Sequence, residues 1–153
     1  MTQVLVAGAL IVVAVVVAIA IQAARRPAPP TQPALGRVPA QLDRREFASP
    51  SAPWLVVVFT SATCHTCADV VAKAAVLACG EVAVDEAEYR TRTDVHRRYH
   101  IDAVPLLVVA DGAGVVRASF VGPVTATDLW AAVAEVRRPG SSPEPHLGQP
   151  TDG

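Results

Sequence analysis

The feature that most constrains the fold is an abrupt change of pattern between residues 54 and 68. Residues 54–59, Trp-Leu-Val-Val-Val-Phe, form an apolar run rich in β-branched and aromatic side chains. The run is too short for a helix and is apolar on both faces, which predicts a strand in the middle of a sheet. Residues 64–67 then read Cys-His-Thr-Cys, and a helix-like stretch begins at Ala68. We therefore expect a central strand that leads through a cysteine-containing loop into a helix.

Strand-like and helix-like stretches alternate through residues 37–138, which predicts an α/β domain with helices packed on a central sheet. The helix expected over residues 68–78 ends near Gly80, and its buried stripe holds Val71, Ala74, Ala75 and Ala78. We expect a short strand over residues 81–85 and an exposed helix over residues 91–99. The aromatic side chains are expected in the core: Trp54, Phe59, Phe120 and Trp130.

A hairpin and a helix are expected to close the domain. Residues 106–110 and 115–120 read as two strands, and the Asp-Gly-Ala-Gly segment at 111–114 has turn chemistry, which predicts an antiparallel pair. Thr125 and Asp128 resemble a capping box at the start of a helix that ends near Arg137.

Composition excludes several classes of function. The formal net charge is −1 with the two signs interspersed, so nucleic-acid binding is not expected. The chain has no asparagine, and therefore no N-glycosylation site and no Cys-His-Asn hydrolase arrangement. It also lacks the glycine-rich loops that bind nucleotides, and we predict no cofactor. Three cysteines are too few for a disulfide scaffold, so a redox or metal-binding pair with one further thiol fits better.

The placement of the prolines outlines the domain. Seven of the thirteen prolines fall within residues 27–53 and four within residues 139–150, which leaves only Pro105 and Pro123 between residues 54 and 138. We expect a Pro-rich linker over residues 22–36, a folded domain over residues 37–138 and a disordered tail over residues 139–153.

An uncharged, apolar run precedes the linker. Residues 4–21 contain 18 residues without a strongly polar side chain, enough for a single transmembrane helix. A cleaved signal peptide is the alternative, but the first residues carry no positive charge. Arg25 and Arg26 follow the run, and the positive-inside rule then places the domain in the cytoplasm; an extracytoplasmic domain is the alternative.

The order of these features resembles the thioredoxin family. The resemblance covers residues 38–137 and depends on Cys64-His65-Thr66-Cys67, Ala103-Val104-Pro105-Leu106 and Val121-Gly122. It implies a thioredoxin-like α/β fold, with a central mixed sheet and flanking helices, after a single transmembrane helix. It also implies a cis Val104–Pro105 peptide bond against the motif, whereas an ordinary trans proline at the start of a strand is the alternative.

The resemblance implies a thiol-disulfide oxidoreductase with Cys64 as nucleophile and Cys67 as resolving thiol. A helix N-terminus favours the Cys64 thiolate, and His65 is a candidate to do the same when protonated. Thr66, Val104 and Pro105 are the other supporting residues. The expected partners are protein thiols or disulfides and an unidentified electron donor, in a role in cell redox homeostasis.

The sequence departs from the family pattern around the motif. Thr63 stands where the family has tryptophan, His65-Thr66 replaces Gly-Pro, and Leu106 replaces the common threonine. The family's buried acid, which helps to take the proton from the second cysteine, falls at Val58. These departures favour a restricted partner over general reductase activity.

Two other functions fit the same residues. Cys64, Cys67, His96 and His100 together have the composition of a zinc site, although the pairs are widely spaced, the histidines flank a helix expected to be solvated, and we predict no metal. A thioredoxin-like interaction module without catalysis is the second alternative. Cys79 is expected to be a small buried side chain, and a third redox thiol is the alternative.

Overall fold

The computed structural model describes residues 37–142 and Gly148. The predicted anchor at 4–21, the linker at 22–36 and most of the predicted tail lie outside these residues. In chain order, the elements are the 3-10 helix η1 (Arg44–Glu46), β1 (Trp54–Thr60), α2 (Cys67–Ala75), β2 (Val82–Glu88), α3 (Thr93–Arg98), β3 (Leu106–Asp111), β4 (Val116–Val121) and α4 (Ala126–Arg137). Within the described part of the chain, no helix has both the length and the apolar character needed to cross a membrane.

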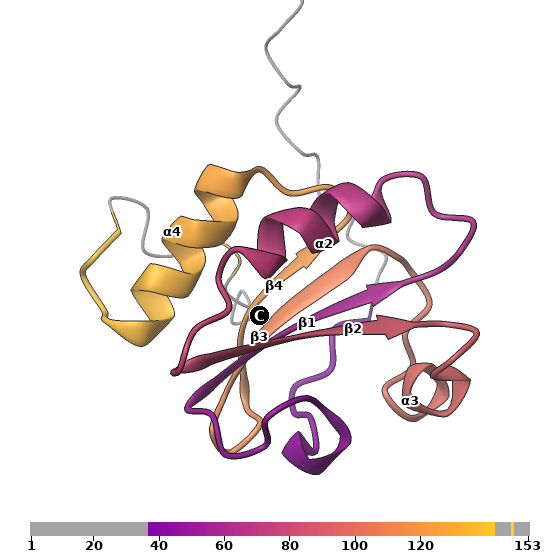
Figure 1. Cartoon of the computed structure of the whole chain (residues 1–153), viewed down its shortest axis with the longest axis horizontal. Coiled ribbons are helices and arrows are strands. Elements are labelled where there is room, and N and C mark those ends of the chain that lie inside the picture. The colour runs from indigo at the N-terminus through magenta and orange to yellow at the C-terminus, as the bar shows by residue number, and fades with distance from the viewer. Residues whose placement is uncertain (1–36, 143–147, 149–153) are drawn as a thin grey trace, which may run out of the picture. The chain divides into compact units, whose positions relative to one another are not determined.

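The four strands form one mixed sheet in the order β2-β1-β3-β4 (Figure 1). β1 pairs with β2 in parallel and with β3 in antiparallel orientation, and β3 and β4 form the predicted antiparallel hairpin. All of β1 except Trp54 is buried, as expected for a strand with neighbours on both edges and helices on both faces. The central mixed sheet with flanking helices confirms the α/β architecture that the sequence predicted.

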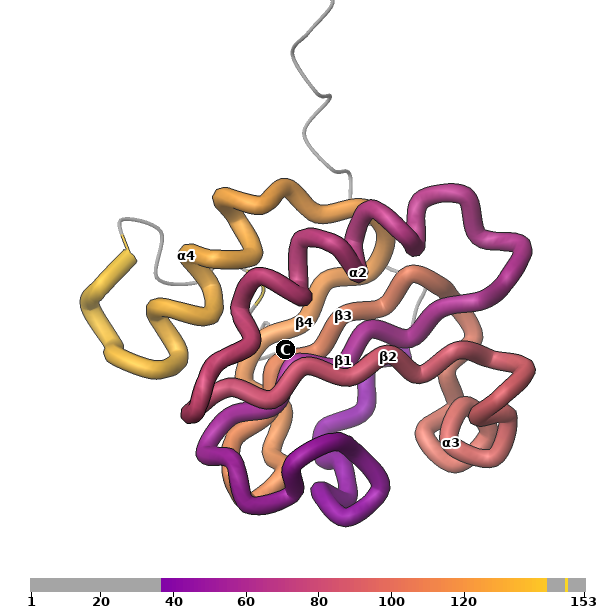
Figure 2. The backbone as a smooth tube through the Cα atoms, viewed as in Figure 1, coloured from indigo at the N-terminus to yellow at the C-terminus, as the bar shows by residue number. Residues whose placement is uncertain are grey.

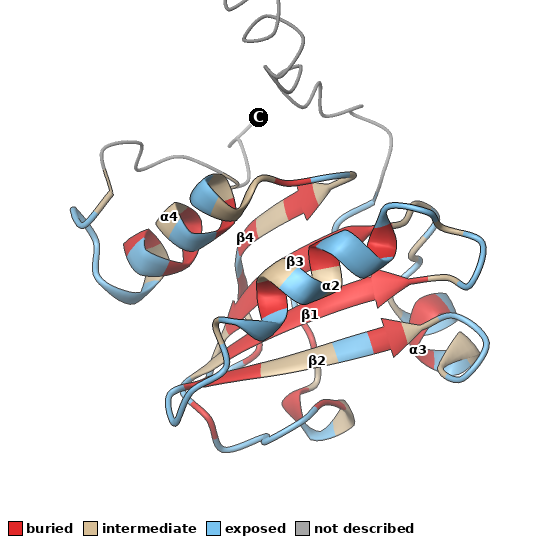
Figure 3. Ribbon diagram, turned by 45° about the horizontal axis from the view of Figure 1, so that its top comes forward, coloured by how far each residue is buried: buried red, intermediate tan, exposed pale blue. Residues whose placement is uncertain are grey.

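Two apolar layers enclose the sheet, because successive side chains of a strand point to opposite faces. On one face Val56 and Val58 pack with side chains of α2 and α4. On the other face Val57 and Phe59 pack with Phe47, which follows η1, and with α3. The tube in Figure 2 shows the N-terminal segment and α3 on the side of the sheet away from α2 and α4. In Figure 3 the central strand β1 is buried along nearly its whole length, whereas β2 also carries intermediate and exposed residues.

The turn of the hairpin requires a glycine. Gly114 has a φ of +84°, its N–H donates to Asp111 O, and its own carbonyl accepts from Leu42 N at 2.8 Å. A Cβ at this position would lie 1.9 Å from Leu42 O, so any side chain would displace the N-terminal segment. Asp111 Oδ1 accepts the N–H groups of Ala113 and Val115 and stabilises the same turn.

The closing helix begins as the sequence predicted. Thr125 is the N-cap of α4, and its hydroxyl accepts the N–H of Asp128 at 3.1 Å. At the other end, Glu135 accepts the N–H groups of Gly140 and Ser142, and the Gly148 carbonyl accepts from Ser119 N at 2.6 Å. These described residues of the predicted tail therefore contact the domain.

The predicted face of α2 was right for Ala74, which is buried, and for Val71, which packs half-buried against the core, but it was wrong for Ala75 and Ala78, and the predicted end was wrong. Its buried residues are Cys67, Val70 and Ala74, whereas Ala75 and Ala78 are exposed. Cys67 lies inward at the first turn, and positions three and seven residues later then share its face. The helix ends at Ala75 with Val76 as its cap, so Gly80 is not its stop. The chain leaves the helix because Cys79 and Val82 instead exchange backbone hydrogen bonds at the start of β2.

Four side chains differ in burial from the prediction: three are more exposed than expected and one is more buried. Cys79 is exposed because it lies beyond the end of α2, and Trp54 is only half-buried at the start of β1. Trp130 is 44% exposed, and its indole N–H points to Lys73 O across the α2–α4 contact at 3.4 Å. His96, expected on a solvated helix, is 2% exposed because its ring lies edge-on between Phe59 and Tyr89.

Candidate active site around the Cys64–Cys67 disulfide

Cys64 and Cys67 form a disulfide between the end of β1 and the first turn of α2, with their Cα atoms 5.5 Å apart. Cys64 N donates to Ser61 O at 3.0 Å, so the loop after β1 turns tightly into the motif. The two sulfur-bearing residues differ in burial: Cys64 is half-buried, whereas Cys67 is 4% exposed. A reactant from solvent therefore reaches Cys64 more readily than Cys67.

The two residues between the cysteines are exposed. The hydroxyl of Thr66 lies 3.8 Å from Cys64 Sγ, and in the disulfide form the hydroxyl is the donor of this contact because the sulfur carries no hydrogen. His65 is exposed within the motif and has no ring or hydrogen-bond partner among residues 37–142 and Gly148. Helix α2 begins at Cys67, and the partial positive charge of its N-terminus favours a thiolate at Cys64 in the reduced state.

The Val104–Pro105 peptide bond is cis, as the resemblance implied. Phe59 pairs with Leu106 in the sheet, so Pro105 lies at the edge where β1 ends and the loop to Cys64 begins. Pro105 is buried, its carbonyl accepts the N–H of Gly122 at 2.7 Å, and Val104 packs against the core on the α3 side. The sheet thus brings the cysteine loop, the proline and Gly122 to one edge.

Glu88, which the sequence reasoning did not select, supports this edge at the end of β2. Its Oε2 accepts the N–H groups of Arg90 at 2.9 Å and Thr91 at 3.1 Å. These N–H groups, Arg90 first, together with the N–H of Ala62, hold the pKa of Glu88 below its ordinary value of 4.5 despite the opposing effect of desolvation.

A second acid, Glu86, also lies on β2 and was missed by the sequence reasoning. It is the register partner of Val58, and its Oε1 accepts the hydroxyl of Thr60 at 2.7 Å. Val58 itself is 1% exposed and apolar, so no ionisable group of β1 lies at this level of the sheet. The sequence predicted that this strand ends at Asp85, whereas β2 continues to Glu88. The additional residues pair Glu86 with Val58 and Glu88 with Thr60, so these four side chains share one face of the sheet.

The structure does not bring the proposed zinc ligands together. Cys64 and Cys67 are joined to each other, and His96 Nε2 donates to Ala87 O at 2.8 Å in the core on the α3 side. His100 is exposed, in the left-handed region at a φ of +54°. Among the described residues, no three His, Cys, Asp or Glu side chains are arranged to hold a metal ion.

Comparison with solved structures returns thioredoxins. Thioredoxin O2 from Arabidopsis thaliana in its oxidised state is 21% identical with a TM-score of 0.49, and covers 56% of this chain and 76% of that one. The thioredoxin of Fasciola hepatica is 22% identical with a TM-score of 0.49, and covers 56% of this chain and 83% of that one. No family model matches the chain, and no curated protein does.

Proposed function

We propose that the chain is a membrane-anchored thiol-disulfide oxidoreductase that exchanges its Cys64–Cys67 pair with a partner protein. The observation that carries the proposal is the disulfide at the start of α2, with one accessible and one buried cysteine. A purely structural disulfide has no need of this asymmetry, whereas exchange requires an accessible sulfur for attack and a protected thiol to complete the reaction. The anchor over residues 4–21 is part of the proposal and depends on the sequence alone.

The exchange proceeds in two displacements. The Cys64 thiolate attacks one sulfur of a partner disulfide, a Cys64–partner disulfide forms, and the other partner sulfur leaves as a thiolate. The Cys67 thiol then loses its proton and attacks Cys64 Sγ, which forms the Cys64–Cys67 bond and releases the second partner thiolate. Two electrons pass from the cysteine pair to the partner, and the released thiolates take up protons. With a dithiol partner the same steps run in reverse and reduce the pair.

Within this proposal, the residues around the motif favour the Cys64 thiolate. The N-terminus of α2 stabilises negative charge, and the Thr66 hydroxyl 3.8 Å from Cys64 Sγ can turn its hydrogen toward the sulfur. Cys67 is buried, and Val58 is apolar where the family has its buried acid, so β1 offers no carboxylate to accept the proton of Cys67. We therefore expect the second displacement to be the slower one and the enzyme to act on a restricted partner.

The test is reduction of a model protein disulfide by the full-length chain, with dithiothreitol as the source of electrons. We expect Cys64→Ser to lower the rate to that of dithiothreitol alone. Cys79→Ser is the matched control, because Cys79 is an exposed cysteine beyond the other end of α2, and its rate should equal that of the wild type. Full activity in Cys64→Ser would refute the catalytic proposal and leave the non-catalytic interaction module.

A further inference from the structure

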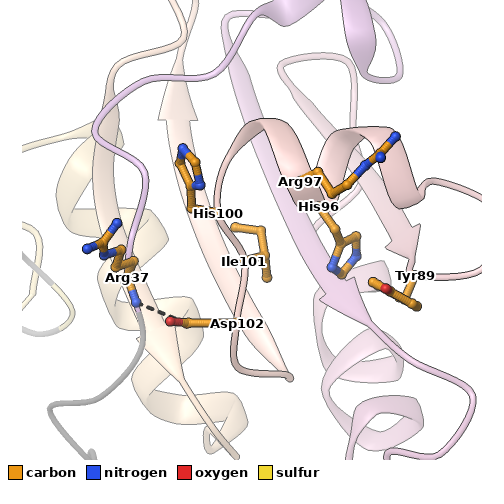
Figure 4. A pocket seen from close by; sticks show the side chains of 7 residues that line it. All are labelled: Arg37, Tyr89, His96, Arg97, His100, Ile101 and Asp102. Carbon is orange, nitrogen blue, oxygen red and sulfur yellow. Dashed lines mark hydrogen bonds between the residues drawn. The ribbon is translucent and has the colours of Figure 1, made fainter.

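An open pocket of about 500 Å³ lies between α3 and the segment that leads to the cis proline. Its walls come from the loop after β2, from α3, from residues 100–102 and from Arg37 in the N-terminal segment. In the view of Figure 4, Arg37 and Arg97 lie on opposite sides of the pocket, with Ile101 between them. His96 belongs to the lining but is held in the core by its hydrogen bond to Ala87 O.

The pocket lies at the same edge of the sheet as the disulfide. Tyr89, a lining residue, donates its N–H to the carbonyl of Thr60 at 2.9 Å, and Thr60 is the last residue of β1 before the loop that carries Cys64. On the other wall, Asp102 precedes Pro105 by three residues. One wall of the pocket is thus hydrogen-bonded to the strand that leads into the motif, and the other wall is continuous with the segment that leads to the cis proline.

The pocket is lined by two arginines without an ion-pair partner among the described residues. Most cationic side chains elsewhere are paired: on α3 itself Arg98 contacts Glu46, and Arg92, just before the helix, contacts Asp85. Arg37 and Arg97, in contrast, form no ion pair with any described residue, and both are exposed. The lining also holds one carboxylate, Asp102, whose Oδ1 accepts the backbone N–H of Arg37 at 3.3 Å. The two guanidinium groups remain available to a ligand.

We propose that this pocket binds an acidic segment of the partner protein whose disulfide is exchanged at Cys64. Guanidinium groups bind carboxylates in bidentate fashion, and the two arginines on opposite sides suit separate carboxylates of an extended peptide. Tyr89, 47% exposed, and Ile101 supply apolar area for the side chains between them. A nucleic-acid backbone fits less well, because Asp102 would repel a continuous row of phosphates. That the ligand belongs to the exchange partner rests on the proposed function. The preference of the pocket for acidic peptides does not depend on that function.

The pocket can be tested without any redox step. The probe is a fluorescein-labelled peptide without cysteine that contains Asp and Glu in its centre, compared with a peptide of equal length that carries Lys at those positions. Binding to the oxidised full-length chain is measured by fluorescence anisotropy at several salt concentrations. We expect tighter binding of the acidic peptide, weakened by added salt, because exposed charges are screened.

Variants assign the binding to the pocket. Arg37→Ala combined with Arg97→Ala should weaken binding of the acidic peptide roughly tenfold. Arg138→Ala is the matched control, because Arg138 is an exposed arginine that lines a different pocket with Trp54, at the opposite end of β1, and it should bind as the wild type does. Arg97→Glu should shift the preference toward the lysine peptide, a gain that misfolding cannot produce.

Equal affinity for the two peptides, or an equal loss in Arg138→Ala, would overturn the proposal. An oligonucleotide of the same charge that binds more tightly than the acidic peptide would also overturn it, since the pocket would then be a nucleic-acid site. Acid-selective binding together with no Cys64-dependent reduction would support the pocket and refute the proposed function, so the two failures are distinguishable.

Discussion

Cys64 and Cys67 share one covalent bond but not the same exposure to solvent. Cys64 is half-buried at the end of a loop, and Cys67 is 4% exposed in the first turn of α2, beside Val70 and Ala74 on the inner face of the helix. The spacing of the cysteines predicted the pair, but only the packing of α2 decides which sulfur is accessible. Because Cys64 is the more accessible of the two, the proposal gives Cys64 the first attack and Cys67 the second.

The order of attack has a direct test in Cys67→Ser. If Cys64 attacks first and Cys67 resolves, this variant should accumulate a covalent complex between Cys64 and the partner, because the second displacement cannot occur. Non-reducing electrophoresis and mass spectrometry detect the complex. Cys64→Ser is the control and should accumulate little, since Cys67 is buried. Equal complex formation by both variants would contradict the assignment.

His65 should tune the stability of the Cys64 thiolate. A cationic imidazole at the position that follows Cys64 favours the thiolate through its charge, and therefore the reduced form, so His65→Gly should lower the reduction potential. We expect a decrease of up to about 30 mV. For a two-electron couple this corresponds to about a tenfold change in the equilibrium constant, or about 1.4 kcal/mol. Equilibration with glutathione redox buffers gives the potential. An unchanged potential would remove His65 from the mechanism.

Among the elements, α4 shows how a local sequence signal and a tertiary contact cooperate. Thr125 caps the helix as its sequence predicted, while Leu129, Ala132 and Val133 pack on the face of the sheet that α2 also covers. The cap could be predicted from the sequence because its donor and acceptor lie only three residues apart. The exposure of Trp130 could not be predicted from the sequence, because it depends on how α2 and α4 pack against each other.

Removal of the cap should have a measurable cost. Thr125→Ala should lower the free energy of unfolding by about 1 kcal/mol, because the N–H of Asp128 loses its acceptor. Urea denaturation followed by tryptophan fluorescence measures the change. Thr125→Ser retains the acceptor oxygen and should stay within a few tenths of a kcal/mol of the wild type. A comparable loss in both variants would show that the methyl group of Thr125, rather than the cap, matters.

The end of β2 should make stability depend on pH through Glu88. The pKa of Glu88 is lowered in the folded chain, first by the N–H of Arg90 and further by those of Thr91 and Ala62. A lowered pKa in the folded state contributes stability that is present above the ordinary value of 4.5 and is lost as the pH falls through the folded value. Glu88→Gln removes this contribution, so the difference in unfolding free energy between wild type and variant should shrink as the pH is lowered from 6 to about 3. A constant difference in unfolding free energy across that pH range would contradict this role of Glu88.

At the scale of the whole molecule, the position of the domain relative to a membrane remains a prediction from residues 4–26. The apolar run predicts a single crossing, and Arg25 and Arg26 after it predict a cytoplasmic domain, where the thiols would meet a reducing glutathione pool.

A membrane-impermeant maleimide tests this topology. Intact cells that produce the full-length chain are labelled before and after lysis, and Cys79 serves as the reporter because it is exposed and outside the disulfide. We expect labelling only after lysis. Labelling of Cys79 in intact cells would place the domain outside the cytoplasm. A second variant with a cysteine at Thr2 reports on the other side of the membrane and should be labelled without lysis.

The elements that depend on neighbouring residues could be predicted from the amino-acid sequence. Four features follow from patterns within a few residues of one another, where backbone preference and side-chain period dominate. They are the central strand, the cysteine motif before a helix, the turn at residues 111–114 and the Thr125 cap. The resemblance to thioredoxins added the cis bond at Pro105, because its motifs matched in order.

Features that depend on residues far apart in the chain emerged only from the folded domain. The inward position of Cys67 set the rotation of α2, ring contacts buried His96, and the extended β2 brought Glu86 and Glu88 level with Val58 and Thr60. Arg37, Arg97 and Asp102 meet in one pocket only because the sheet carries their segments to the same edge. Such contacts follow from the packing free energy of the complete domain, which no short stretch of sequence contains.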